Sequence, residues 1–250
     1  MFKTFFLILL CSYIFFEFYI KNFFSVGQGK KAIYKIVRGS VIYSQMLAVI
    51  LLPILSMMVF RYWIAASILF FMTEFLKYLY LQKERPLLKT ARHHERNAYL
   101  LFQLLHIVCL FLLAYMFAKE RNVLRVLPCI EDFFTVSGLS KIQILSWITA
   151  LLLIHRPANT VISVLLAGYK NEEKKEETDH NAGRVIGTLE RLIILILVSL
   201  GQYSATALVL TAKSIARYDK ISKEPAFAEY YLLGTLMSLV AVLVISLLIK

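Results

Sequence analysis

The sequence predicts an all-α protein, a polytopic transmembrane helical bundle of about seven spans, and two observations support this class. Hydrophobic residues make up 59% of the 250-residue chain, and the mean hydropathy is +0.68, whereas ordinary soluble domains are about 45–50% apolar. Several apolar runs also approach the roughly 20 residues that a helix needs to cross a bilayer. We therefore expect a multi-pass membrane protein whose main partner is the lipid bilayer.

The formal net charge of +12 lies mainly in stretches between the apolar runs. This distribution is typical of membrane-flanking segments attracted to anionic lipid headgroups. The sequence contains no soluble basic domain to bind nucleic acid, so nucleic acid is not an expected partner. Its three cysteines have neither a disulfide nor a metal-ligand spacing. We predict no metal and no cofactor.

Six apolar runs each predict one span: Thr4–Phe24, Val41–Phe60, Tyr62–Leu81, Tyr99–Ala118, Leu192–Thr211 and Phe227–Ile249. The first is longer than a signal-peptide core and lacks a small-residue cleavage site, so we expect it to be retained. Between the fourth and fifth runs, Pro157 interrupts an apolar segment that forms either one kinked span or a re-entrant pair.

These elements predict a single transmembrane domain over residues 1–250. The first four spans occupy residues 1–118. Residues 119–180 hold an interfacial segment, the span or re-entrant pair with Pro157, and a charged loop. The last two spans occupy residues 181–250, which include the most distinctive sequence of the chain.

Basic residues predict the orientation in the membrane. Residues 21–38 and 83–96 each contain five Lys or Arg, whereas the junction of the second and third spans offers only Arg61. The positive-inside rule makes the two basic stretches cytoplasmic and the N-terminus external. A further basic stretch contains Lys213, Arg217, Lys220 and Lys223. It faces outward if Pro157 kinks one span and inward if the segment around Pro157 crosses the membrane twice. The positive charge of the stretch favours the second arrangement.

Polar residues inside the apolar runs predict an intramembrane polar cluster. A carboxylate in hydrocarbon is costly, so Glu17 and Glu74 either face the bundle interior or take up a proton. Lys77 lies three residues after Glu74 and can pair with it on one helix face. If one helix continues to Lys213, Gln202 lies near the midplane. The alternatives are a structural ion pair and a hydrogen-bonding helix contact. The candidate residues are Glu17, Glu74, Lys77, His106 and Gln202.

The stretch "HNAGRVIGTLERLIILILVSLGQ" (His180–Gln202) predicts an interfacial helix start. Gly183 and Gly187 form a G-x-x-x-G face for close helix packing, and Gly234 and Ser238 form a second pair of small residues. The charges precede the apolar run, so we expect them at the interface. A helix N-terminus with arginines suits a lipid phosphate. The alternative is a positive flank with packing glycines. The candidate anion or lipid-headgroup residues are Arg184, Glu190, Arg191, Lys213 and Arg217.

The segments "NAGRVIGTLERLIILILVSLGQ", "AKSIARY" and "AEYYLLGTLMS" closely resemble a bacterial integral membrane protein family known as domain of unknown function 3307. The resemblance covers the last third of the chain and implies a multi-pass protein of the bacterial cytoplasmic (inner) membrane. Ordinary members carry His-x-x-x-Asp in the first and third spans, a His before Ile-Tyr, and Asp-Gln-x-x-His in the fourth span. The resemblance implies an intramembrane His/carboxylate cluster that binds a metal or shuttles protons.

The first half of this chain departs from that pattern. Its corresponding segments are "YIFFE", "GSVIY", "FFMTE" and "FQLLH". Acidic groups remain at Glu17 and Glu74, and His106 is retained, whereas most of the other histidines are replaced. This loss puts metal binding in doubt and indicates altered or lost chemistry. The pattern positions are Tyr13, Glu17, Gly39, Phe70, Glu74, Phe102, Gln103 and His106.

Three functional hypotheses remain open. The first is transport or channel-like handling of a small or lipid-linked anion, with carboxylates that switch protonation. The second is an intramembrane enzyme acting on a lipid-linked substrate, with Glu17 or Glu74 as a base or metal ligand. The third is a non-catalytic packing or signalling component. The sequence has no P-loop, nucleophile elbow, zincin helix or dinucleotide motif. It leaves open a homo-oligomer or a membrane partner.

Overall fold

The computed structural model describes residues 1–21, 30–54, 57–84, 91–122, 124, 126–166 and 180–249. Within these ranges the chain is helical apart from turns and one isolated bridge between Ile54 and Val126, which confirms the all-α class. Among the described residues, six helical segments are long and apolar enough to cross a membrane, where the sequence predicted about seven spans. They are Phe2–Ile20, Ala32–Leu51, Met58–Gln82, Asn97–Lys119, Lys141–Leu166 and Pro225–Ser246.

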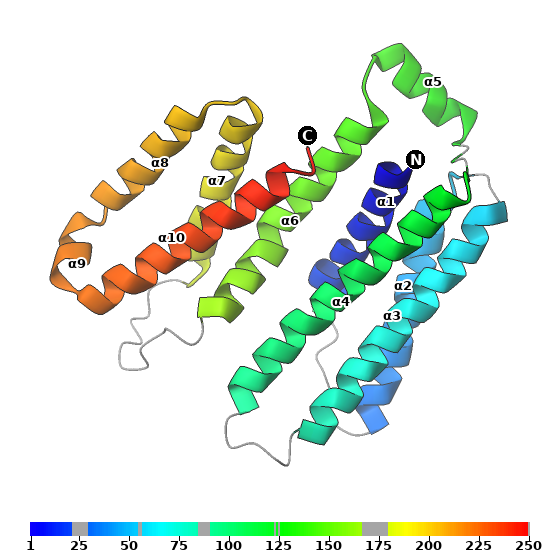
Figure 1. The fold of residues 1–250 in the computed structure, drawn as a ribbon, viewed down its shortest axis with the longest axis horizontal. Helices are drawn as coiled ribbons and strands as arrows, with labels where there is room; N and C mark the ends of the chain where they lie inside the picture. Colours follow the sequence, from blue (N-terminus) through cyan, green and yellow to red (C-terminus); the bar gives the residue numbers. More distant parts are fainter. Residues whose placement is uncertain are drawn as a thin grey trace. The chain divides into compact units, whose positions relative to one another are not determined.

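The chain divides into two compact units, Met1–Thr149 (unit 1) and Ala150–Lys250 (unit 2), which are described separately. In unit 1, α1 (Phe2–Phe15) continues into the π-helical turn η1 (Phe16–Ile20). The next helices are α2 (Lys30–Leu51), α3 (Met57–Glu84) and α4 (Ala91–Lys119). Helix α1 contacts α2 and α4, and α3 contacts the same two, so the four helices close a ring (Figure 1).

Aromatic side chains fill the interior of this four-helix ring. Phe5 stacks on Phe117 with ring centroids 4.1 Å apart, and Tyr43 stacks on Phe70 at 4.3 Å. All four side chains are buried. Such pairs each contribute about 0.5–1.5 kcal/mol beyond their buried area. Helix α5 (Pro128–Ser137) follows α4 and buries no residue, and α6 (Lys141–Leu166) then leads into unit 2.

The turn between α2 and α3 lies earlier than the sequence predicted. The predicted spans Val41–Phe60 and Tyr62–Leu81 meet at Phe60 and Arg61, but α2 ends at Leu51 and α3 begins at Met57. Pro53 explains the difference, because proline disfavours a helical residue before it and has no N–H to continue the helix. Arg61 is therefore a helical residue of α3, and its guanidinium lies 2.8 Å from the Glu120 carboxylate.

In unit 2, α6 runs through Pro157 as one helix. The re-entrant pair around Pro157, which the basic stretch from Lys213 to Lys223 favoured, is therefore wrong. A proline inside a helix removes one backbone hydrogen bond, and neighbouring groups in membrane proteins can satisfy the carbonyls that are freed. Pro157 leaves Leu153 O without its helical donor, and Arg191 Nε donates to the next carbonyl along the helix, that of Ile154, at 3.3 Å.

Helices α7 (His180–Ser199) and α8 (Tyr203–Ile215) form a hairpin (Figure 1). Gly201 adopts a φ of 73°, and the N–H of Gln202 donates to Leu197 O at 2.8 Å, which ends α7. The predicted single span Leu192–Thr211 is therefore wrong, and Gln202 is an exposed turn residue rather than a midplane helical one. Helix α9 (Tyr218–Lys223) and α10 (Pro225–Ser246) complete the unit, and α10 contacts both α7 and α9.

We predict that Gly201→Val destabilises the protein by about 1–2 kcal/mol, because a side chain strains a left-handed backbone. The measurement is the free energy of unfolding in detergent. Gly183→Ala is the matched control, since Gly183 is helical and no described atom lies within 4 Å of the added carbon. It should cause no loss, because alanine favours a helix over glycine by about 1 kcal/mol. Equal losses in both variants would contradict the assigned turn.

Candidate functional site

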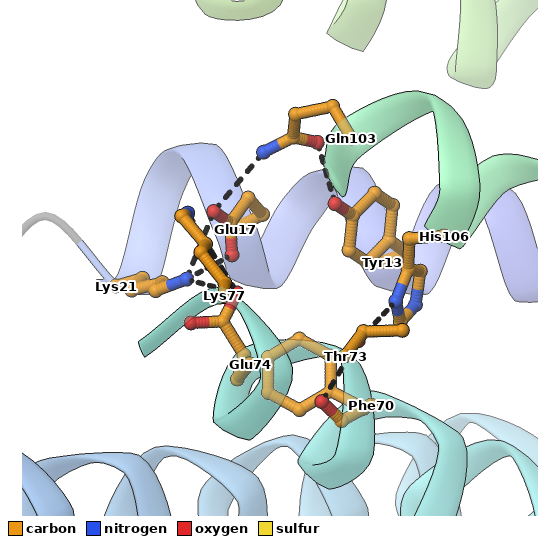
Figure 2. A network of polar contacts seen from close by, with 9 residues as sticks. All are labelled: Tyr13, Glu17, Lys21, Phe70, Thr73, Glu74, Lys77, Gln103 and His106. Atoms are coloured by element: carbon orange, nitrogen blue, oxygen red, sulfur yellow. Dashed lines mark hydrogen bonds and ion pairs between the residues drawn. The ribbon is translucent and has the colours of Figure 1, made fainter. Parts of the chain in front are cut away.

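The interior of unit 1 contains a group of connected polar side chains, which we call the polar network (Figure 2). It joins residues from η1 and the end of α1 to residues of α3 and α4. Its members are Tyr13, Glu17, Lys21, Thr73, Glu74, Lys77, Gln103 and His106.

Four charged side chains make up one end of the polar network. The ammonium group of Lys21 lies 2.7 Å from the Glu17 carboxylate and 2.8 Å from that of Glu74. The ammonium group of Lys77 lies 3.9 Å from the same Glu74 oxygen, and 5.1 Å from the centre of the Tyr99 ring. Two carboxylates and two ammonium groups have no net charge, which reduces the cost of placing them inside an apolar bundle.

A π-helical turn positions Glu17 and Lys21. Glu17 belongs to η1, and Lys21 follows the turn one residue later, so the two side chains pair at four residues' separation. Single π-turns within α-helices are frequent at functional sites. Burial acts to lower the pKa of the Lys21 ammonium, but the carboxylates of Glu17 and Glu74 outweigh it and raise that pKa above its usual value. Lys21 therefore stays charged, and a carboxylate is the better candidate for proton exchange.

Hydrogen bonds extend the network from Glu17 deeper into the bundle. Gln103 Nε2 donates to Glu17 Oε1 at 3.1 Å, and the Tyr13 hydroxyl donates to Gln103 Oε1 at 2.5 Å. The His106 ring then stacks on the Tyr13 ring at 4.0 Å. His106 is 2% exposed, so this end of the network is closed to solvent.

The hydrogen bonds of His106 define its tautomer. Its Nδ1 lies 2.9 Å from the Thr73 hydroxyl, which itself donates to Phe70 O at 3.0 Å. With the hydroxyl proton engaged there, Nδ1 is the donor to Thr73, and Nε2 carries the free lone pair. The Nε2 atom is buried and makes no hydrogen bond to any residue that the structure describes.

Aromatic rings lie beyond His106. The Phe70 ring contacts His106 edge-on at 5.5 Å, stacks on Tyr43 at 4.3 Å and meets Phe16 at 5.3 Å. The chain of polar contacts ends at this layer. The polar network thus extends from the charged end of the bundle into its interior and ends at His106.

The structure brings together four of the five predicted cluster residues: Glu17, Glu74, Lys77 and His106. Gln202 is not among them, because it lies exposed in the α7–α8 turn of unit 2. Sequence reasoning missed Lys21, which it assigned to the cytoplasmic flank. The four-residue spacing from Glu17 is the signal that could have identified this pairing.

The described residues do not form a metal site. No group of three His, Cys, Asp or Glu side chains in the described ranges could hold a metal ion. Phe70, which replaces a histidine of the resembled family pattern, lies at the centre of the aromatic layer. Gly39, another such position, faces Phe16, whose ring lies 3.9 Å from an added Cβ. The ring of Phe102, which replaces an aspartate of the same pattern, lies 6.0 Å from the Tyr80 ring, measured between the ring centres.

In unit 2, the predicted interfacial anion site is not assembled as expected. Glu190 and Arg191 are 8% and 3% exposed, so they lie inside the protein rather than at an open interface. Lys213 pairs with Glu190, with Nζ 2.8 Å from Oε1. Arg184 is exposed, and the Arg217 guanidinium lies 5.8 Å from the centre of the Tyr231 ring.

Arg191 connects three helices of unit 2. Its guanidinium donates to Asn159 Oδ1 on α6 at 2.6 Å and to Ser238 Oγ on α10 at 3.4 Å, besides its bond to Ile154 O. These acceptors are neutral oxygens, so the fixed fork of donors, rather than a carboxylate contact, holds this buried cation. The sequence could not reveal this burial, because it depends on α6 and α10 covering α7.

The predicted packing glycines have different surroundings. Gly183 has no described atom within 4 Å of an added Cβ, so no helix packs on it there. Gly187 instead leaves room for the Arg191 guanidinium, which lies 3.5 Å from that position. Gly234 packs against Leu166 of α6 at 3.4 Å, and Ser238 accepts from Arg191. Only the second pair of small residues thus lies at a helix contact.

Comparison with known proteins gives no match for the chain. No family model matches it, no curated protein is similar to it, and no solved structure resembles it at a significant level. The resemblance to domain of unknown function 3307 therefore stays a prediction. The fold itself defines the class: a multi-pass, all-α membrane protein, with six apolar helices of spanning length in the part of the chain that the structure describes.

We predict that Lys21→Met lowers the free energy of unfolding by about 3 kcal/mol, because it leaves the buried Glu17 carboxylate without a cation and the half-buried Glu74 carboxylate with Lys77 alone. Lys141→Met is the control, since it breaks an exposed 3.1 Å pair with Glu131 and should cost under about 1 kcal/mol. Unfolding in detergent measures both. A loss for Lys21→Met no larger than the control's would contradict a central role for this pair.

We also predict that Arg191→Lys lowers the stability of the protein by about 2 kcal/mol, because a lysine cannot reproduce the spread donors to three helices. Arg184→Lys preserves charge at an exposed position of the same helix and should have little effect. Thermal unfolding followed by circular dichroism compares the two. Equal melting temperatures in the two variants would argue against Arg191 as a structural link.

Proposed function

We propose that unit 1 binds a small or lipid-linked anion together with a proton, and that Glu74 is the group that takes up the proton. The observation that carries this proposal is that Glu74 is the carboxylate paired with both lysines, at 2.8 Å from Lys21 and 3.9 Å from Lys77. These lysines favour the charged carboxylate, so Glu74 takes up a proton only at acidic pH, and its protonation leaves a positive charge without a partner. Such proton-linked binding is the first step of an anion transport cycle. The bacterial cytoplasmic membrane is the location proposed for it.

Unequal pairing supports Glu74 as the switching group. Lys21 has a second carboxylate partner in Glu17, whereas Glu74 is the one carboxylate within ion-pair distance of Lys77 among the described residues. When Glu74 is protonated, the four charged groups carry a net charge of +1. An anion contacting Lys77 restores neutrality, and an apolar surrounding favours such neutrality strongly. One proton and one monovalent anion therefore enter together.

Pairing and accessibility together support Lys77 as the contact for the anion: the Lys21 side chain is 25% exposed but stays paired with Glu17. The side chains of Glu74 and Lys77 are 18% exposed, whereas that of Glu17 is 5% exposed. Lys21 follows η1 and Lys77 lies in the last part of α3, and the positive-inside rule assigns the sequence stretches 21–38 and 83–96 to the cytoplasm. Basic side chains around an entrance raise the local concentration of anions. The aromatic layer at Phe70 closes the opposite end, which argues for alternating access rather than an open pore.

The other groups around Glu74 fit this assignment. Lys21 approaches it from the residue after η1, Lys77 from its own helix, and His106 from α4. His106 contacts the Thr73 hydroxyl through Nδ1 at 2.9 Å. A purely structural role for the polar network is the alternative that the experiment must separate.

We predict that chloride stabilises the wild-type protein at acidic pH but not at alkaline pH, because Glu74 must be protonated before an anion binds. Glu74→Gln, which mimics the neutral acid, should be stabilised by chloride at both pH values. The measurement is the melting temperature in detergent with chloride exchanged for gluconate at constant ionic strength. To test a lipid-linked anion, the melting temperature is also compared between nanodiscs of phosphatidylglycerol, which is anionic, and nanodiscs of phosphatidylcholine, which carries no net charge.

Glu120→Gln is the matched control, since it neutralises a glutamate of the same unit that pairs with Arg61 on the surface. Its response to pH and chloride should equal that of the wild type. Two results would contradict the proposal: no stabilisation by chloride or phosphatidylglycerol in any variant, or an unchanged pH dependence in Glu74→Gln. Either result would leave the polar network with a structural role.

A further inference from the structure

We infer that α7 and α8 form a re-entrant hairpin that enters a single leaflet of the bilayer and turns at Gly201 near the midplane. The partner of its outer face is the acyl chains of that leaflet. This inference concerns unit 2 and does not depend on anion binding by unit 1.

Contacts within the hairpin establish that the chain turns back. The Lys213 ammonium near the end of α8 lies 2.8 Å from the Glu190 carboxylate in the middle of α7, so the two helices run side by side in opposite directions. At the turn, Gly201 N donates to Val198 O at 3.1 Å and Gln202 N donates to Leu197 O at 2.8 Å. Tyr203 N donates to Gly201 O at 3.1 Å. These bonds satisfy backbone groups that would be costly at membrane depth.

The lengths of the two arms fit one leaflet. Eleven residues separate Glu190 from Gly201, which corresponds to roughly 16 Å of helix at about 1.5 Å per residue. Ten residues separate Tyr203 from Lys213, which gives roughly 15 Å. The hydrocarbon core is about 30 Å thick, so each arm reaches about halfway. Neither arm can cross the bilayer from its charged base.

The distribution of charge and apolar surface supports the same placement. Residues 192–212 contain no Asp, Glu, Lys or Arg. Large apolar side chains on the hairpin face outward, among them Leu200 and Leu208, which are 66% and 69% exposed. Basic side chains gather at the opposite, open end: Arg184, Lys213, Arg217 and Lys220. The hairpin therefore has exposed apolar side chains at its turn and basic side chains at its open end. This distribution is expected of a segment that enters the bilayer from an anionic headgroup layer.

The inference also accounts for the basic residues that follow α8. Counting crossings along the chain, α6 is the fifth span, and a re-entrant hairpin returns the chain to the side on which it began. Lys213, Arg217, Lys220 and Lys223 then lie on the same side of the membrane as the basic stretches 21–38 and 83–96. The positive-inside rule is thus satisfied with one crossing at Pro157. Helix α10 becomes the sixth span.

Single cysteines introduced into the full-length protein test this placement. The background replaces Cys11, Cys109 and Cys129 with serine, and restoring Cys129 marks the side that follows four crossings. Gly183→Cys and Ser214→Cys report the two bases of the hairpin, and Leu200→Cys reports its tip. Sealed vesicles of one orientation are treated with a membrane-impermeant maleimide from either side. A spin label at Leu200→Cys reports depth through its collisions with oxygen and with a water-soluble nickel complex.

We expect Gly183→Cys and Ser214→Cys to react from the same side, opposite to Cys129. We expect Leu200→Cys to be protected from both sides, with a label that favours oxygen over nickel. Reaction of Ser214→Cys from the Cys129 side would mean that the segment spans the membrane. Reaction of Leu200→Cys from the Gly183 side would mean that the hairpin lies in water. Either result overturns the inference, and the three exposed positions keep the risk of misfolding small.

Discussion

The cost of a charge inside an apolar helical bundle is the constraint that organises this structure. An isolated buried charge is unfavourable by many kilocalories per mole, so it must have a counter-charge or several hydrogen bonds. The two units meet this requirement in different ways. Unit 1 places two lysines among two glutamates, with Lys21 shared between Glu17 and Glu74. Unit 2 surrounds Arg191 with neutral oxygens from three helices, and pairs the neighbouring Glu190 with Lys213.

These two solutions have different consequences for function. The arrangement around Arg191 depends on several fixed acceptors, so it links helices and has little capacity to exchange partners. The charges in unit 1 are less evenly matched, because Lys77 is held only loosely at 3.9 Å. A proton on Glu74 changes the balance of the whole group, whereas Glu17 remains paired with Lys21. A network that is neutral in one protonation state and cationic in the other is suited to coupling a proton to an anion.

The sequence predicted the helical membrane class and the convergence of Glu17, Glu74, Lys77 and His106, because costly polar groups in apolar runs must face one another. It did not predict the hairpin at Gly201, since a glycine within an apolar run leaves hydropathy almost unchanged although its backbone reverses the chain. It placed the α2–α3 turn too late, because the charge of Arg61 was a stronger signal than Pro53. The burial of Arg191 depends on cover from α6 and α10, which no local pattern reveals.

The most direct test of the account is the protonation state of Glu74 itself. Infrared difference spectroscopy on protein with isotope-labelled glutamate can record carboxylate and carboxylic acid bands while chloride replaces gluconate at acidic pH. The account predicts that chloride binding converts one carboxylate to the acid form, and that this change is absent in Glu74→Gln and present in Glu120→Gln. If no glutamate gains a proton, or if the change persists in Glu74→Gln, proton-linked anion binding at this site is contradicted.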